Sequence, residues 1–166
     1  RVNILQPGPG VGGHCISVDP WFLVGDYPDL ANLILTARKI NDSMPTHVLG
    51  RIRDIMKEHN ITDISKIGIY GLAYKENVDD TRESPTLQLL ERMNEHLAFG
   101  VKVYDPFIKD RIVDYQFMNF EDFIKEIEIL VIIVAHEHIK NNLGRVKDKL
   151  ILDTKNICNF NGVYKL

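Results

Sequence analysis

The apolar residues between positions 30 and 56 recur every three or four residues, a spacing that places side chains on one face of a helix. They are Leu30, Leu33, Ile34, Ala37 and Ile40, followed by Val48, Ile52, Ile55 and Met56. Ser43 is a good N-cap and Pro45 fits a first helical turn, so we expect two helices here rather than one. Segment 1–27 is rich in Gly and Pro and is expected to be irregular.

From residue 63 onward, short apolar runs alternate with segments of helical spacing. The expected strands lie within residues 66–74, 101–106, 129–136 and 150–156. The expected helices lie within 84–97, where a Ser-Pro pair marks the start, and within 119–127, with a short helical turn before the last strand. This alternation predicts an α/β fold, a Rossmann-like parallel sheet with flanking helices. We therefore expect a small helical part over 1–62 and the α/β domain over 63–166.

Composition argues against several classes of function. The net charge is -3 over 166 residues and the basic residues form no run, so nothing favours binding to nucleic acid or to an anionic membrane. The longest apolar stretch, 129–135, is too short to cross a bilayer. Two cysteines make no disulfide framework, which favours a reducing, cytoplasmic location. The sequence begins at Arg1 without a signal-like segment, so we expect it to belong to a longer protein.

A glycine-rich segment near the amino terminus has the spacing of a dinucleotide fingerprint. Gly8, Gly10 and Gly13 fit G-x-G-x-x-G, which binds a pyrophosphate when a strand precedes it and a helix follows. Only "RVNIL" precedes these glycines, and we expect Pro20 to prevent an early helix. We therefore do not interpret the spacing as a dinucleotide site.

The same glycines lead directly into His14 and Cys15. Residues without side chains leave space around a thiol, and Asp19 follows Cys15 by four positions. This arrangement suits a cysteine nucleophile, whose thiolate form its surroundings must favour. A small buried side chain in a turn has the same residue pattern, and the residue types alone leave both readings open.

The histidines offer no convincing metal site. His14 and Cys15 are adjacent and do not easily converge on one ion, and His136 and His138 lack further ligands at a suitable spacing. We expect no metal and place His136 and His138 in an exposed loop after a strand.

A second cluster, residues 74–85, follows the first expected strand of the α/β part. Lys75 and Arg82 precede a helix start at Ser84, and cations beside a helix N-terminus favour phosphate. Four acidic residues in the same segment allow a simpler alternative, a solvated loop of mixed charge. Lys155, at the end of the last expected strand, lies at a comparable edge.

The two clusters resemble one enzyme family. "RVNILQPGPGVGGHCISVDPWFLV" resembles the active-site loop of nucleotide-sugar 6-dehydrogenases, the UDP-glucose/GDP-mannose dehydrogenase family, and "GLAYKENVDDTRESPTLQLLERM" resembles the start of its UDP-binding domain. "VKVYDP" and "ILDTKN" continue the resemblance in order. It implies a two-step, NAD-dependent oxidation of a sugar C6 alcohol to a carboxylate, in a homodimer or larger homo-oligomer and in a pathway to surface polysaccharide.

The resemblance also implies roles for individual residues. Cys15 corresponds to the nucleophile, and Asp19 to an aspartate that assists water or proton transfer. Contacts to NAD are implied for Arg82 and for Cys15 itself. Contacts to the UDP-sugar are implied for Arg1, Gln6, Gly12, Tyr74, Lys75 and Lys155. Cys158 matches no functional position and is expected to be a packing residue.

Two parts of the family pattern are missing from this sequence. The amino-terminal NAD-binding domain and most of the central domain, with its catalytic lysine, have no counterpart in the 166 residues. We therefore expect this chain to be inactive alone. The loop motif does not separate UDP-N-acetylhexosamines that differ at C2, and a non-catalytic nucleotide-binding or dimerisation module remains an alternative.

Overall fold

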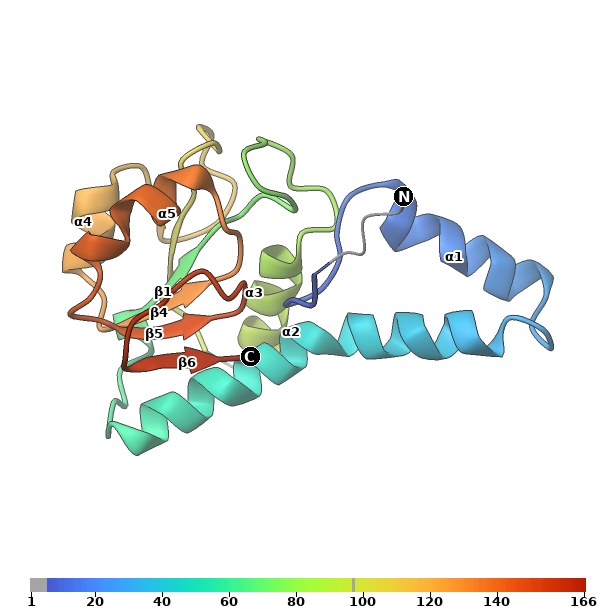
Figure 1. Cartoon of the computed structure of the whole chain (residues 1–166), viewed down its shortest axis with the longest axis horizontal. Helices are drawn as coiled ribbons and strands as arrows, with labels where there is room; N and C mark the ends of the chain where they lie inside the picture. The colour runs from blue at the N-terminus through green and yellow to red at the C-terminus, as the bar shows by residue number, and fades with distance from the viewer. Residues whose placement is uncertain (1–5, 97) are drawn as a thin grey trace.

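The computed structural model describes residues 6–96 and 98–166 (Figure 1). The helices are α1 (Cys15–Asp26), α2 (Asn32–Glu58), α3 (Pro85–Glu95), α4 (Phe120–Lys125) and α5 (Glu137–Asn142), with short 3-10 turns η1 (Ile64–Lys66) and η2 (Leu143–Arg145). The strands are β1 (Ile67–Tyr70), β2 (Lys102–Tyr104), β3 (Gln116–Phe117), β4 (Ile129–Ile132), β5 (Leu150–Asp153) and β6 (Val163–Lys165).

The strands form one parallel sheet in the order β3-β2-β1-β4-β5-β6. The predicted Rossmann-like fold is confirmed, although β3 and β6 were not expected. The strand order reverses direction between β1 and β4. In such sheets ligands bind in the crevice outside the carboxyl ends of the strands at this reversal. The fold therefore directs attention to the segments that follow β1 and β4.

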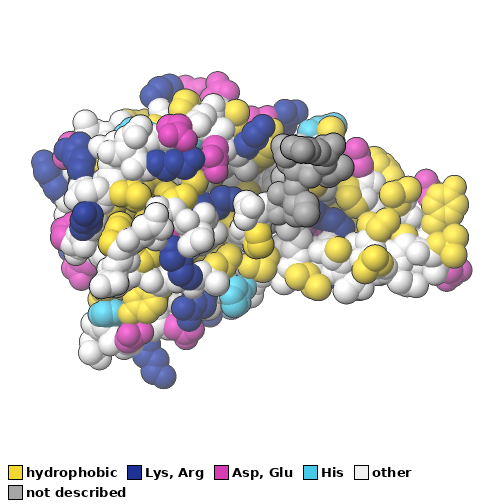
Figure 2. Space-filling model, viewed as in Figure 1, with side chains coloured by type: hydrophobic (Ala, Val, Ile, Leu, Met, Phe, Trp, Pro, Cys, Tyr) yellow, Lys and Arg dark blue, Asp and Glu magenta, His cyan; other side chains and the backbone are white. Residues whose placement is uncertain are grey.

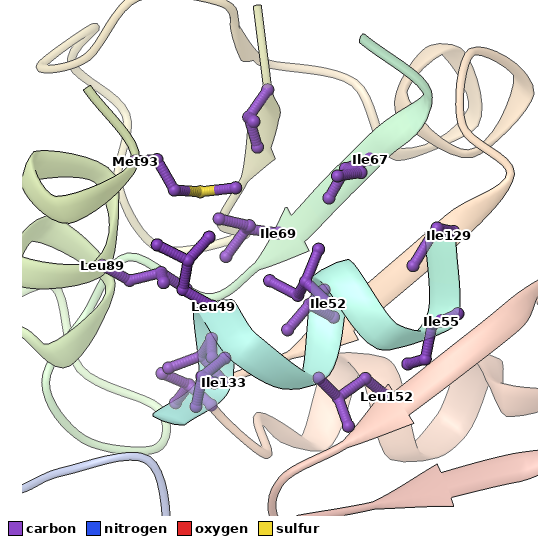
Figure 3. Packing of buried hydrophobic residues seen from close by; sticks show 14 residues of the cluster. Leu49, Ile52, Ile55, Ile67, Ile69, Leu89, Met93, Ile129, Ile133 and Leu152 are labelled. Atoms are coloured by element: carbon purple, nitrogen blue, oxygen red, sulfur yellow. The ribbon is translucent and has the colours of Figure 1, made fainter. Parts of the chain in front are cut away.

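Successive residues of a strand point to opposite faces, and both faces of this sheet are buried. Ile67 and Ile69 of β1 face α2 and α3, whereas Tyr70 faces the side covered by α4 and α5. Figure 3 shows Leu49 and Ile52 of α2 directed at this strand. The carboxyl-terminal half of α2 is thus part of the core of the α/β layer.

Two helix predictions near the amino terminus are wrong, and both errors involve proline. Pro45 does not start a second helix, because α2 is continuous through it and Ser43 donates a hydrogen bond to the Ile40 carbonyl. Pro20 does not prevent an early helix, because α1 begins at Cys15 and contains it. A proline inside a helix leaves the carbonyl four residues earlier without its usual donor, a cost that other contacts can offset.

The hairpin of α1 and the amino-terminal half of α2 extends beyond the α/β layer (Figure 1). Figure 2 shows hydrophobic side chains along this extension. The exposed ones are Ile16, Trp21, Phe22, Leu23, Tyr27, Leu30, Leu33 and Ile40. Exposed apolar side chains gathered on one part of a protein are typical of interaction surfaces. No helix among the described residues is long and apolar enough to cross a membrane.

Candidate functional site

A hollow of about 250 Å³ lies at the carboxyl ends of β1, β4 and β5. It is lined by Pro9, Gly10, Tyr74, Lys75, Glu76, Pro85, Ile133, Val134 and Lys155. Both predicted clusters therefore contribute to one cavity, together with the segment after β4. Its position is the crevice where the strand order reverses.

The start of α3 forms one wall of this hollow. Ser84 caps the helix by accepting a hydrogen bond from the Thr86 backbone N–H at 3.2 Å, and Pro85 occupies the first helical position, as the sequence predicted. The N-terminal end of a helix favours anions, and Lys75 lines the same hollow. The charges here suit a phosphate group.

Glycine is required where the Cys15 loop meets the segment after β1. A Cβ atom on Gly12 would overlap the Glu83 carbonyl and would lie 2.8 Å from the Cβ of Tyr74. Gly13 has φ +91°, and a Cβ there would lie 2.9 Å from the Tyr74 ring. The Gly13 N–H also donates to the Arg82 carbonyl at 2.9 Å. The two motifs are therefore packed backbone against backbone.

Cys15 is the first residue of α1 and is exposed. Cys15 therefore belongs to the first turn of a helix, the end of a helix that favours negative charge. The His14 Nδ1 lies 3.9 Å from its sulfur, although no catalytic role was predicted for His14. Asp19 is exposed one turn later in α1, and residues four apart share a helix face. A thiol and a carboxylate are therefore presented together.

Arg82 is held beside this loop by Asp80. Its Nε donates to both Asp80 carboxylate oxygens at 3.0 Å, and its Nη2 donates to one of them at 2.6 Å. The hydrogen bond from Arg82 lowers the pKa of Asp80, and the pKa of Arg82 is raised in return. Part of the cationic character of Arg82 is thus neutralised within its own loop.

Lys155 lines both this hollow and a wider groove of about 1050 Å³. Gln6, Gly8 and α2 line this groove, and a Cβ on Gly8 would lie 3.3 Å from the Lys155 ammonium. Cavities of about 300–1,000 Å³ hold cofactor-sized ligands. Lys155 therefore borders both the hollow, with Tyr74 and Lys75, and the groove, with Gln6. Arg1 lies outside the described residues, so its expected substrate contact stays a prediction.

Sequence reasoning missed the buried carboxylate of Asp105, which follows β2. Its Oδ2 accepts hydrogen bonds from Leu72 N at 2.6 Å, Ala73 N at 2.9 Å and His136 Nε2 at 3.1 Å. Burial raises the pKa of Asp105, but the hydrogen bonds outweigh it and the pKa lies below its usual value. Its position directly after a predicted parallel strand was the feature of the sequence that could have identified Asp105 as a site residue. Asp105 fixes the turn that leads to Tyr74.

The expected exposed loop for the two histidines is wrong. His136 is fully buried, and its Nδ1 accepts from the Asn77 N–H at 2.8 Å, so its Nε2 carries the proton donated to Asp105. His138 is partly buried and its Nδ1 lies 3.0 Å from the Tyr70 hydroxyl. Both rings serve polar networks that a single sequence does not reveal. The described residues contain no group of three or more His, Cys, Asp or Glu that could hold a metal.

Cys158 lies in the core on the α4 and α5 side of the sheet. Burial raises the pKa of its thiol to about 12. A thiol with so high a pKa is protonated at neutral pH and unreactive, so Cys158 is a packing residue, as predicted.

Two family models together match most of the chain. The UDP binding domain of the UDP-glucose/GDP-mannose dehydrogenase family matches residues 68–160, and the central domain of that family matches residues 1–43. The chain belongs to the UDP-glucose/GDP-mannose dehydrogenase family.

Curated members of the family are similar over almost the whole chain. A UDP-N-acetyl-D-mannosamine dehydrogenase of Methanocaldococcus jannaschii is 47% identical over 96% of the chain and 37% of its own length. An NDP-N-acetyl-D-galactosaminuronic acid dehydrogenase of Ralstonia nicotianae is 38% identical over 93% of the chain and 37% of its own length. The chain thus spans somewhat more than a third of these relatives.

Solved structures of the family share the fold. The UDP-D-ManNAc dehydrogenase of Pyrococcus horikoshii superposes with a TM-score of 0.81 at 31% identity, over 99% of this chain and 40% of the other. A UDP-N-acetyl-mannosamine dehydrogenase of Staphylococcus aureus gives a TM-score of 0.79 at 36% identity, over 99% of this chain and 40% of the other.

Proposed function

We propose that the chain is the carboxyl-terminal part of a cytoplasmic, NAD-dependent dehydrogenase that oxidises UDP-N-acetyl-D-mannosamine at C6 to UDP-N-acetyl-D-mannosaminuronate. The observation that carries the proposal is the packing of the Cys15 loop against the Tyr74–Arg82 segment. This contact joins the loop that carries an exposed thiol to a segment that lines a cavity suited to phosphate. The names of two similar proteins, one a curated relative and one a solved structure, support this choice of sugar.

In the proposed reaction the Cys15 sulfur forms a bond to C6 and is later released from it. After the alcohol is oxidised to an aldehyde, the thiolate adds to the aldehyde carbon and a proton reaches the oxygen, which gives a thiohemiacetal. The second oxidation gives a thioester, and water attacks its carbonyl carbon to release the carboxylate and the free thiol. Asp19, on the same helix face as Cys15, assists the water or proton transfer. A sulfur nucleophile suits this sequence because it both adds and leaves readily.

The UDP moiety is proposed to occupy the cavity at the carboxyl ends of the strands. Lys75 and Lys155 supply cations for its phosphates, Tyr74 forms a wall, and Gln6 and Gly12 provide the loop that covers it. Because the hollow and the larger groove share Lys155, the two together offer more room than a single phosphate needs, as a nucleotide and a sugar require.

NAD supplies the hydride acceptor for both oxidations when it is bound. Arg82 fits one contact to this anionic cofactor, because its carbonyl accepts from the Gly13 N–H of the Cys15 loop and its Nη1 makes no hydrogen bond among the described residues. We propose that the remaining contacts come from a part of the protein outside these 166 residues, and that the chain alone does not reduce NAD. The exposed apolar hairpin supports association into a homodimer or larger oligomer.

The test compares turnover of the longer protein that contains this chain on UDP-N-acetylmannosamine and on UDP-N-acetylglucosamine, with NAD reduction as the readout. Faster turnover of the first substrate and loss of activity in Cys15→Ala are expected. Preference for UDP-N-acetylglucosamine would change the proposed substrate but not the proposed reaction. Full activity in Cys15→Ala would leave a non-catalytic nucleotide-binding or dimerisation module as the function of this chain. NAD reduction by the 166 residues alone would refute the proposal that the remaining NAD contacts come from another part of the protein.

A further inference from the structure

One face of helix α2 packs against the rest of the molecule, and the side chains on this face change from polar to apolar along the helix. Val48, Ile52 and Ile55 occupy this face in the carboxyl-terminal half and are buried against the sheet. About two and three turns before Val48 the same face carries Asn41 and Arg38, both polar. Arg38 is only 9% exposed, so it occupies a position where packing alone would favour an apolar side chain.

Arg38 contacts the backbone immediately after Cys15. Its Nη1 donates to the Ile16 carbonyl at 3.4 Å, and its Nη2 pairs with Asp42 at 2.5 Å. The Ile16 carbonyl is the one that Pro20 leaves without a helical donor. Arg38 therefore supplies from α2 the hydrogen bond that α1 cannot make for itself.

Asn41 contacts the backbone before Cys15. Its Oδ1 accepts a hydrogen bond from the Val11 N–H at 3.1 Å. Val11 precedes the two packed glycines, so Asn41 and Arg38 hold the loop on opposite sides of the thiol. Two side chains three residues apart on one rigid helix thus fix both ends of the segment 11–16.

This arrangement is not explained by stability alone. The Nε of Arg38 is buried and makes no hydrogen bond among the described residues. Burying a charged group with an unpaired donor costs free energy, and an apolar side chain of similar size would often serve stability as well. Holding a reactive group in place, by contrast, requires directional contacts to the backbone that carries it.

We propose that Arg38 and Asn41 are positioning residues that hold Cys15 in place for attack on the sugar C6. This inference rests on the proposed function and adds two residues to it. Neither side chain needs to touch the substrate, since both act through the backbone of the Cys15 loop. A displacement of about 1 Å at a reacting centre can cost about 100-fold in rate.

The test uses the longer dehydrogenase with the variants Arg38→Met and Asn41→Leu, each of which removes one backbone contact. We expect kcat to fall about 10- to 100-fold in both variants. KM for the UDP-sugar should stay within about three-fold in Arg38→Met, because Arg38 lines neither the hollow nor the groove, whereas Asn41 lines the groove, so the fall in kcat is the diagnostic readout for Asn41→Leu. Asn41→Asp keeps an acceptor for the Val11 N–H and is expected to retain most of the activity. Lys39→Met is the matched control, since Lys39 is exposed on α2 and makes no hydrogen bond or ion pair among the described residues.

The outcomes separate the two proposals. If Cys15→Ser keeps full activity, the proposed function itself is wrong. If Cys15→Ser is inactive but Arg38→Met and Asn41→Leu match Lys39→Met in kcat, the positioning role is refuted. A rise in KM with kcat unchanged also refutes it, because that result describes substrate binding. Should Arg38→Met not fold, which UDP binding would reveal, Asn41→Leu against Asn41→Asp decides alone, since rescue by the acceptor is specific to the contact.

Discussion

Replacing Gly12 by alanine tests the contact between the Cys15 loop and the segment after β1. The added Cβ would overlap the Glu83 carbonyl and would lie 2.8 Å from the Tyr74 Cβ. The first of these neighbours is backbone, so relief requires the loop to move rather than a side chain to rotate. Overpacking costs about 1–3 kcal/mol, and we take the upper end, about 3 kcal/mol, because no flexible atom can yield. In a chain of this size that lowers Tm by about 6–12 °C.

Two measurements on the 166-residue chain test this: the temperature of thermal unfolding and, on separate folded samples, the rate at which iodoacetamide alkylates Cys15. Gly50→Ala is the matched control, because Gly50 lies in α2 and an added Cβ there meets nothing within 4 Å. Alanine is the better helix former by about 1 kcal/mol, so this control should raise Tm by about 2–4 °C. If Gly12→Ala unfolds at the wild-type temperature and its Cys15 reacts at the wild-type rate, the loop does not pack as described.

Three further predictions concern charged residues. Lys75→Ala should weaken UDP binding to the chain by about 10- to 100-fold, as measured by calorimetry, because that is the contribution of one charge-assisted hydrogen bond. The control Lys39→Ala should leave UDP affinity unchanged. Equal affinities in the two variants would remove Lys75 from the site. Asp105→Asn must turn an amide N–H toward backbone donors, so the free energy of unfolding should fall by about 2 kcal/mol, seen as a lower Tm, and UDP affinity should fall as well. An unaltered UDP affinity would show that this carboxylate does not position the loop. Asp153 is buried, which raises its pKa, but the hydrogen bonds that it accepts, the first from Lys165, lower it below the usual value. The stability from this carboxylate is therefore fully present above about pH 4 and is lost as pH falls through its folded-state pKa. Asp153→Asn should cost about 2 kcal/mol at pH 7 and progressively less as the pH is lowered below about 4, and a pH-independent difference would contradict the assignment.

The sequence predicted the α/β layer well because its signals are local. The apolar run 129–135 could only be a buried strand, and the Ser84–Pro85 pair caps α3 in the structure as expected. The two unpredicted strands, β3 and β6, contain only two and three residues and owe their extended form to pairing with a neighbour. Pairing of that kind depends on contacts distant in sequence and is invisible to periodicity.

The errors around the candidate site have a common cause. Pro20 and Pro45 are local signals for a break, but tertiary contacts override them, and Arg38 illustrates how a distant side chain can supply the missing donor. His136 was expected to be exposed because its partner Asp105 lies 31 residues away in sequence. A polar side chain buried by a distant partner has the same sequence signature as one facing water.

Because α2 is one continuous helix, the number of residues in it determines where its amino-terminal half holds the Cys15 loop. One half of α2 is fixed in the core of the sheet and the other half holds the Cys15 loop. Each residue of an α-helix advances about 1.5 Å and turns about 100°. Inserting one residue between Pro45 and Val48 would therefore rotate Arg38 and Asn41 away from the loop while leaving every contact of the core intact. An insertion of seven residues would restore the face to within about 20° but would displace it by about 10 Å. The number of residues in this helix is thus a determinant of the site, independently of which residues they are.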